Sequence, residues 1–208
     1  MYRNSVDQFM EALASKSAIP GGGGAAALGG SMAAALGSMV ANLTIGKKTY
    51  ASVENQAIEM EKKLSALRIE FLELINGDAE AFEPLSKAYG LPKTTAEELS
   101  HRNEVLENAL YGASRIPLVI MEKVLELLDI LDCMEKIGSK LAISDVGVAV
   151  QYARCALLSA SMNVFINTNM MKDKKKALEL EKRADEMAVV GVEKADQIYK
   201  NVMKKIHK

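Results

Sequence analysis

The chain has 208 residues, 49% of them hydrophobic, which is enough for one domain with a sizeable core and argues against disorder. Its formal net charge is −1, so no overall field draws it to nucleic acid or to anionic lipid. Aromatic residues make up only 5%, so Ala, Leu, Ile, Val and Met must build the core, and this composition favours helices over sheets.

Cysteine and histidine are scarce. Cys133 and Cys155 both fall in apolar helical patterns, and His101 and His207 complete the supply of soft metal ligands. This is too little for a disulfide framework or a zinc site. We expect buried, reduced thiols in a cytoplasmic protein without a metal, and the polar N-terminal residues contain no secretory segment.

The first predicted helix begins after Ser5, which has capping-box spacing with Gln8. Its apolar face is Val6, Phe9, Met10 and Leu13. The run Pro20–Gly24 follows, and we expect no regular element there, because glycine and proline interrupt both helices and strands.

Residues 25–46 carry no charge and are long enough to cross a bilayer. They are mainly Ala, Gly and Ser, which contribute little to membrane insertion and let helix backbones approach closely. We interpret the segment as a buried central helix that could lie at a subunit interface. A transmembrane span is the lesser alternative. Lys47 and Lys48 stand just beyond its end, where cations suit the helix dipole.

A long helical period follows over residues 52–89, and we expect a kink or weak point where Asn76 and Gly77 interrupt its apolar stripe. Thr95 has capping-box spacing for the next helix, which Pro117 is expected to end or kink. A strongly apolar helix is predicted over residues 118–134. Ser144 is the expected cap of a helix over residues 145–170, and a last helix begins at Asp173. The whole pattern predicts an all-α fold: a single antiparallel bundle of about six or seven helices, forming one domain over residues 1–208.

The glycine run is the first candidate site. A glycine loop that leads into a helix presents free N–H groups and the positive end of the dipole, which suits an anion or a carbonyl oxygen. Neither a Walker loop nor a dinucleotide fold fits, because the run lacks a Gly-Lys-Ser/Thr ending and a preceding strand. The alternative is a loop that only lets the small-residue helix dock tightly.

Asp78 is the second candidate. It follows the Asn76-Gly77 interruption and lies near Ile75 and Phe82 if the helical period continues. Burial raises the pKa of a carboxyl group, which would prepare it for proton transfer near neutral pH. The alternative is a local cap for backbone N–H groups at Gly77.

Asn163 and Asn167 are the third candidate site. They lie four residues apart on one face of an apolar helix. Their amides can donate and accept, either to the edge of a polar heterocycle or between neighbouring helices of the bundle. Asp145 is a first-turn acid that by default complements the helix dipole. Lys47, Lys48 and Lys93 could bind a carboxylate tail.

Several segments, in the order and spacing of the family's motifs, resemble the cyclodeaminase/cyclohydrolase family. This family comprises the C-terminal part of formiminotransferase-cyclodeaminase and stand-alone bacterial methenyltetrahydrofolate cyclohydrolases. They are Ile19–Ala25, Met39–Lys48, Asp78–Phe82, Leu91–Lys93, Ser144–Asp145 and Asn163–Asn167. The similarity covers nearly the whole chain. The family's loop commonly reads Pro-Gly-Gly-Gly-Ser, so Gly24 stands here in place of the serine and one hydroxyl contact is lost.

The resemblance implies a helical homodimer that binds a tetrahydrofolate derivative as substrate in a cleft near the subunit interface, with no tightly bound cofactor, metal, nucleic acid or membrane. Asp78 matches the family's catalytic acid. The expected substrate-binding residues are Pro20, Gly21, Gly22, Gly23, Gly24, Asn42, Lys47, Lys48, Phe82, Lys93, Asp145, Asn163 and Asn167.

The expected activity is hydrolysis of 5,10-methenyltetrahydrofolate to 10-formyltetrahydrofolate, formation of the methenyl compound from 5-formiminotetrahydrofolate with release of ammonia, or both. Asp78 is expected to transfer the proton. A folate-binding or helical scaffold protein without turnover is the alternative from a different class.

Overall fold

A computed structural model describes residues 5–207 of the chain, and these residues form helices and no strand. The α-helices are α1 (Val6–Ala14), α2 (Gly22–Asn42), α3 (Glu54–Tyr89), α4 (Ala96–Ile137), α5 (Ile143–Met170) and α6 (Lys174–Ile206). Two short 3-10 helices, η1 (Lys48–Val53) and η2 (Lys140–Ala142), lie in the connections. The all-α prediction is confirmed.

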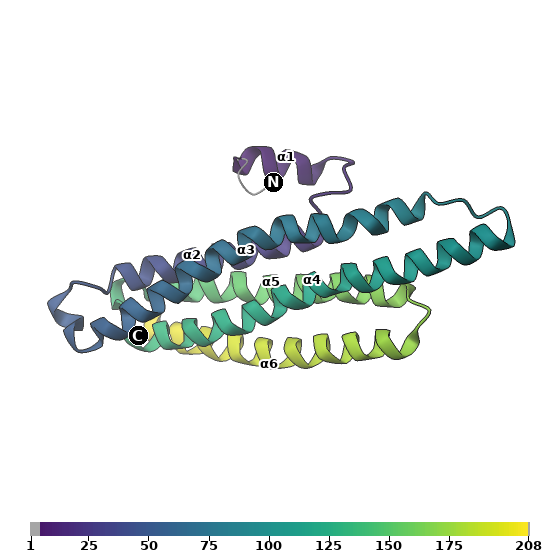
Figure 1. The fold of residues 1–208 in the computed structure, drawn as a ribbon. Helices are drawn as coiled ribbons and strands as arrows, with labels where there is room; N and C mark the ends of the chain where they lie inside the picture. Colours follow the sequence, from purple (N-terminus) through teal and green to yellow (C-terminus); the bar gives the residue numbers. More distant parts are fainter. Residues whose placement is uncertain (1–4, 208) are drawn as a thin grey trace.

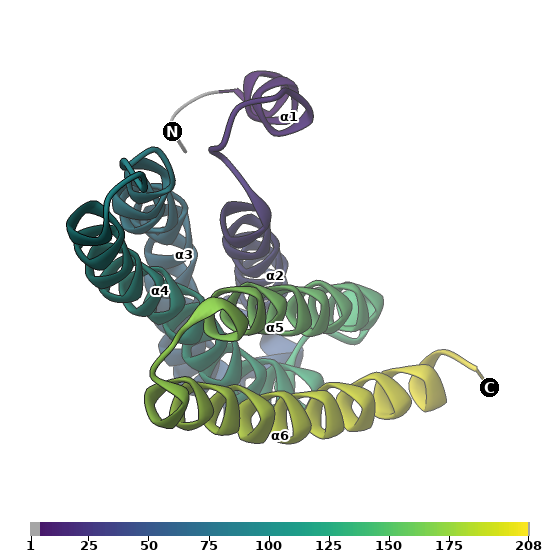
Figure 2. The same cartoon turned by 90° about the vertical axis from the view of Figure 1, so that its right-hand side faces the viewer.

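Helices α2 to α6 form an elongated antiparallel bundle (Figure 1). Helix α2 packs between α3 and α5, and α4 contacts α3, α5 and α6. Helix α1 stands apart from the bundle and is joined to α2 by residues 15–21 (Figure 2). Of its predicted apolar face only Phe9 is buried, whereas Val6 and Met10 are exposed.

The small residues of α2 allow neighbouring helices to approach its backbone. A β-carbon at Gly30 would lie 2.6 Å from the Phe71 ring, and one at Gly37 would lie 2.8 Å from Leu64 Cδ2. Both partners come from α3, so large side chains of α3 fill the space that α2 leaves free. Helix α2 is thus a central packing element, as its composition predicts.

Two helical stretches, α2 and residues 140–170, are long and apolar enough to cross a membrane by length and composition alone. In α2, 56% of the apolar window is buried against other helices, and in the second stretch 44% is buried. Core helices of soluble proteins pass the same test, so this finding is weak support for a membrane span.

Three boundary predictions are wrong. The glycines at 22, 23 and 24 do not precede the helix but form its first turn, because the first N–H groups of a helix need no intrahelical acceptor. Pro117 does not end a helix: α4, which is 42 residues long, continues through it to Ile137. Ser144 is not a cap, since α5 begins one residue earlier and Ala142 is its N-cap.

Other local predictions hold. Ser5 with Gln8 and Thr95 with Glu98 form reciprocal capping boxes. Asp173 accepts a hydrogen bond from the Lys176 N–H at the start of α6. Helix α3 continues through Asn76 and Gly77.

The two cysteines are unpaired, but Cys155 is exposed, so the prediction that both thiols are buried is wrong.

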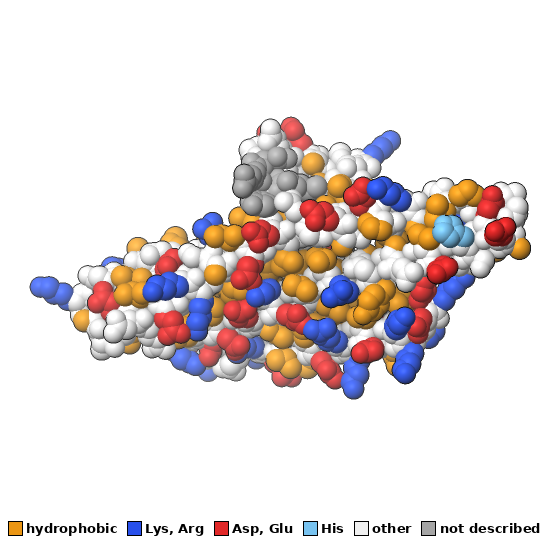
Figure 3. All heavy atoms as spheres, in the orientation of Figure 1, with side chains coloured by type: hydrophobic (Ala, Val, Ile, Leu, Met, Phe, Trp, Pro, Cys, Tyr) orange, Lys and Arg blue, Asp and Glu red, His pale blue; other side chains and the backbone are white. Residues whose placement is uncertain are grey.

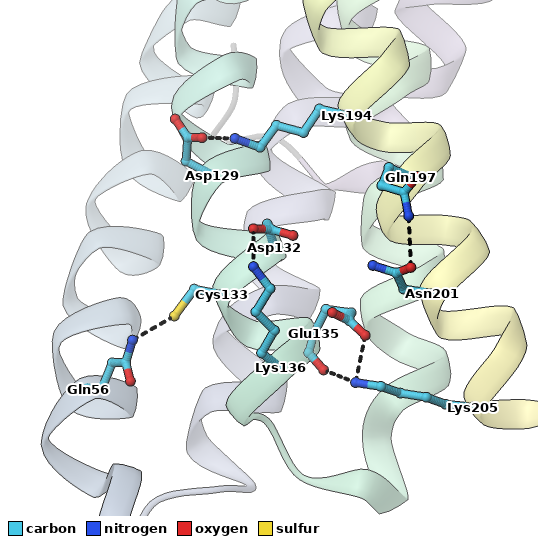
Figure 4. A network of polar contacts seen from close by, with 10 residues as sticks. All are labelled: Gln56, Asp129, Asp132, Cys133, Glu135, Lys136, Lys194, Gln197, Asn201 and Lys205. Carbon is cyan, nitrogen blue, oxygen red and sulfur yellow. Dashed lines mark hydrogen bonds and ion pairs between the residues drawn. The ribbon is translucent and has the colours of Figure 1, made fainter.

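The face formed by α3, α4 and α6 carries interspersed acidic and basic side chains (Figure 3). Ion pairs across it include Lys123–Glu70 between α3 and α4, and Lys194–Asp129 between α4 and α6. At the end of α4, Lys205 Nζ lies 2.6 Å from both the carboxylate and the carbonyl oxygen of Glu135, which is only 3% exposed (Figure 4). The contacts of Lys194 and Lys205 join α6 to the bundle.

Candidate functional site

A small cleft opens where the first turn of α2 meets the middle of α3 and α4 and the C-terminal part of α5. Its volume is about 130 Å³. Its walls are Ala18, Ile19, Gly21, Gly22, Gly23, Asp78, Phe82, Ala113, Pro117, Asn163, Ile166 and Asn167. Asp78 is the only ionisable side chain among these described residues.

Asp78 lies on α3 directly against the glycine turn. A β-carbon at Gly23 would be 2.0 Å from Asp78 Oδ1, so only glycine leaves room for the carboxylate. Burial raises the pKa of Asp78 above its ordinary value, and the backbone N–H of Gly24 partly offsets that rise. The carboxylate therefore faces the positive end of α2 in a partly dehydrated setting, where an acid is suited to exchange protons.

Two amides from α5 face the same turn. Asn163 Nδ2 donates to the carbonyl oxygen of Ser159 at 2.8 Å, and a β-carbon at Gly22 would lie 3.1 Å from Asn163 Oδ1. Asn167, one helical turn further, is only 8% exposed and lines the cleft. The two amides thus supply polar groups on the wall across from Asp78.

The remaining walls are apolar, and sequence reasoning missed most of them. Phe82 was predicted, but Ile19, Ala113, Pro117 and Ile166 were not. Ile19 precedes the glycine run, and Ile166 stands between the two asparagines, so both were adjacent to recognised motifs. Ala113 and Pro117 lie on α4 and carry no such signal. Together these side chains give the cleft an apolar contact surface.

Within one chain the structure brings together only part of the predicted set. Gly21, Gly22, Gly23, Asp78, Phe82, Asn163 and Asn167 line the cleft, with Pro20 and Gly24 packed against each other behind it. Asp145 lies in the first turn of α5, far from the asparagines at its other end. Lys93 lies in the connection between α3 and α4, at the projecting tip of that helical hairpin (Figure 1).

Asn42, Lys47 and Lys48 lie at the opposite end of α2 from the glycine turn. The 21 residues of α2 separate the two ends by about 30 Å at 1.5 Å per residue. Thr44 holds this end to the turn between α4 and α5, because its Oγ1 accepts from the Ser139 N–H at 2.9 Å. These three residues therefore do not reach the Asp78 cleft of their own chain.

A second, larger cavity of about 660 Å³ lies at this opposite end. Tyr50 of η1 lines it and accepts a hydrogen bond from the Lys140 N–H at 2.9 Å. Lys136, Lys140 and Lys205 contribute cationic side chains to its wall. The two ends of α2 thus differ in their surroundings: one faces a single acid among glycines and amides, and the other lies near several lysines.

The fold and cleft define a helical-bundle protein with one partly buried acid against a glycine-rich helix start. A sequence profile described as formiminotransferase-cyclodeaminase matches residues 5–186, and the chain belongs to this family. It is 38% identical over 203 residues to a methenyltetrahydrofolate cyclohydrolase of Methylorubrum extorquens, covering 98% of both chains.

Two further relatives carry the other activity in their names. The chain is 31% identical over 169 residues to a formimidoyltransferase-cyclodeaminase of Rattus norvegicus, covering 81% of this chain and 31% of that protein. A crystal structure of formiminotetrahydrofolate cyclodeaminase from Thermotoga maritima superposes with a TM-score of 0.81 at 28% identity, over 98% of this chain and 96% of that one.

Proposed function

We propose that the chain is a folate one-carbon enzyme that hydrolyses 5,10-methenyltetrahydrofolate to 10-formyltetrahydrofolate. The observation that carries this proposal is the placement of Asp78, an acid with a raised pKa, in a cleft formed by the first turn of α2. The full-length match to a protein named methenyltetrahydrofolate cyclohydrolase supports the choice of reaction.

The reaction requires alignment and proton transfer. Water adds to the methenyl carbon between N5 and N10, and Asp78 takes one of its two protons. The bond from carbon to N5 then breaks as Asp78 returns that proton to N5, and the remaining hydroxyl group releases its proton to solvent as the formyl carbonyl forms. The methenyl carbon is already electrophilic because it belongs to an amidinium cation, so the proposed reaction needs no tightly bound cofactor or metal. Proton transfer by a positioned carboxylate typically contributes about 100- to 10,000-fold.

The direct test follows the loss of methenyltetrahydrofolate absorbance with purified protein. The matched variant Asp78→Asn keeps the shape and one acceptor oxygen, and we expect its turnover to fall by about 100- to 10,000-fold. A folded variant with undiminished turnover would remove Asp78 from the mechanism. No turnover by the unaltered protein would refute the cyclohydrolase assignment.

Cyclodeamination is the second candidate, because the structural neighbour and the mammalian relatives carry that name. In that reaction N10 attacks the formimino carbon and ammonia leaves. Incubation with 5-formiminotetrahydrofolate separates the two, since methenyl absorbance then rises instead of falling. Tight folate binding with neither change would favour the alternative of a binding protein without turnover.

We further propose that the protein acts as a cytoplasmic homodimer through the outer faces of α2 and α5. In α2 and its C-cap, the exposed or half-buried positions 22, 25, 29, 32, 36, 39 and 43 follow one another in steps of three and four. In α5 positions 148, 152, 155, 159, 162 and 166 do the same, and Met162 and Ile166 are 69% and 59% exposed. Such spacing on two adjacent helices is the pattern of a helix-packing seam.

A two-fold axis near Met32, the middle of the α2 seam, would set the two α2 helices antiparallel. Residue 22 of one copy would then lie opposite residues 42–43 of the other, because a two-fold interface pairs positions reciprocally. The partner's Asn42, Lys47 and Lys48 would thereby reach the glycine turn that they cannot reach within one chain. In this arrangement the lysines face the carboxylate tail of a folate whose ring lies beside Asp78.

A further inference from the structure

Asn163 has an orientation that its hydrogen bond determines. Its Nδ2 lies 2.8 Å from the carbonyl oxygen of Ser159, and a carbonyl oxygen can only accept. The amide nitrogen must therefore occupy that position, and the other branch of the side chain is the oxygen Oδ1. A β-carbon at Gly22 would lie 3.1 Å from Oδ1 and 3.2 Å from Nδ2. The side chain thus brings an acceptor oxygen to the glycine turn, beside the amide nitrogen that donates to Ser159.

This acceptor lacks a protein donor. Among the described residues, the only hydrogen bond of the Asn163 side chain is the one its nitrogen gives to Ser159. A half-buried acceptor at the wall of a cleft is satisfied by a ligand or a water molecule. The absence of a β-carbon at Gly22 keeps this space open, since one would lie 3.1 Å from Oδ1.

Asp78, on α3, presents a second acceptor to Gly23, the next residue of the glycine turn after Gly22. Its Oδ1 faces Gly23 as Asn163 Oδ1 faces Gly22, and both side chains line one cleft of about 130 Å³. That volume holds a few water molecules at most. Two acceptors on one small cleft suit a molecule with two donor hydrogens and a lone pair to direct elsewhere, and water has this set.

We infer that Asn163 is a positioning residue for the attacking water, an assignment that rests on the proposed cyclohydrolase function. The water donates one hydrogen to Asn163 Oδ1 and the other to Asp78, and its lone pair then faces the methenyl carbon. As the carbon–oxygen bond forms, Asp78 takes the proton on its side, while the bond to Asn163 holds the oxygen in line. Asn163 exchanges no proton, because an amide oxygen is a weak base.

The test compares two variants at this position with a control on the same helix. Asn163→Leu keeps the size but removes the acceptor, Asn163→Asp keeps an acceptor oxygen, and Asn169→Leu changes an exposed asparagine two turns away. For Asn163→Leu we expect kcat for methenyltetrahydrofolate to fall about 10- to 100-fold. KM, and the Kd for the stable analogue 5-formyltetrahydrofolate, should change less than about threefold, because the lost contact holds water and not folate.

Asn163→Asp gives a readout that a purely structural role would not affect. It should recover part of the turnover and shift the acidic limb of the pH–rate profile upward, since a second carboxyl group beside Asp78 raises the pKa of the pair. No other ionisable side chain lines the described cleft, so this shift has one source. Circular dichroism and Tm verify that each variant folds.

Two outcomes overturn the inference separately. Full kcat in a folded Asn163→Leu protein excludes water positioning, and a raised KM with unchanged kcat shows that Asn163 holds the folate instead. Either result leaves the proposed function intact when the unaltered protein hydrolyses methenyltetrahydrofolate. Absence of hydrolysis by the unaltered protein refutes the proposed function and the positioning role together.

Discussion

Gly23 lies so close to Asp78 that a β-carbon on it would sit 2.0 Å from Oδ1 and 2.5 Å from Cγ of the acid. Gly23→Ala must therefore displace the carboxylate, and a displacement of about 1 Å can cost on the order of 100-fold in rate. We expect at least that loss of cyclohydrolase turnover. Gly112→Ala is the control, because a β-carbon there meets no atom within 4 Å. Normal rates in a folded Gly23→Ala enzyme would show that the position of Asp78 does not matter.

Asp78 should also lower the free energy of unfolding at neutral pH. Burial raises its pKa in the folded state, so the stability that its neutral form provides is present below the unfolded-state pKa and is lost as pH rises through the folded value. Asp78→Asn should therefore unfold at higher urea concentration at pH 7, and the difference should shrink as the pH falls through the folded pKa. Urea titrations at several pH values test this, and a variant less stable at pH 7 would contradict it.

Two glycines in the middle of helices should respond to alanine in opposite directions. Gly77 has only Ile116 Cδ1 near its missing β-carbon, at 3.8 Å, so Gly77→Ala should gain about 0.5–1 kcal/mol of helix propensity and about 1–4 °C in Tm. At Gly191 the same carbon would lie 2.3 Å from Leu157 Cδ2, so Gly191→Ala should lose about 1–3 kcal/mol through overpacking. Calorimetry on both proteins checks the pair.

Lys205 should stabilise the end of the bundle more than Lys204 does. Its ammonium lies 2.6 Å from the carboxylate of Glu135, a buried acid at the end of α4 (Figure 4). Because the lysine itself is nearly half exposed, we expect Lys205→Met to cost about 1–2 kcal/mol, or about 2–8 °C in Tm. Lys204→Met, which removes an exposed lysine, should leave Tm within about 1 °C.

Mixing two defective chains tests the shared cleft. A Lys47→Ala/Lys48→Ala chain and an Asp78→Asn chain should each be nearly inactive as homodimers under limiting substrate. Random pairing makes half of the dimers mixed, and each mixed dimer has one intact cleft, so activity should return to roughly a quarter of the normal value. No recovery after verified subunit exchange would show that the lysines do not serve the partner's cleft.

Helices were predictable wherever local signals act alone. The capping boxes at Ser5 and Thr95 and the cap at Asp173 depend on residues three positions apart, and all three are present in the structure. Pro117 shows the limit of such reasoning. It is buried in α4 and lines the cleft, so packing against neighbouring helices outweighs the hydrogen bond that proline cannot donate.

The cleft was predictable in part. Sequence motifs indicated Asp78, the glycines and the two asparagines, which the structure places together. They could not indicate that Asn42 and Lys47 lie about 30 Å away, because a motif gives order along the chain but not which helix ends meet. The walls from Ala113 and Ile166 were missed because small and apolar residues look the same in a core and in a binding site.

The backbone N–H of Gly24 lowers the pKa of Asp78, and this links the protonation of the acid to the first turn of α2. A carboxylate is a stronger acceptor than a carboxylic acid, so the turn is held most firmly while Asp78 is ionised. In the proposed reaction the proton reaches Asp78 just as the carbon–oxygen bond forms. The contact with the helix start would then weaken once per catalytic cycle, while the tetrahedral intermediate is present and before the bond to N5 breaks.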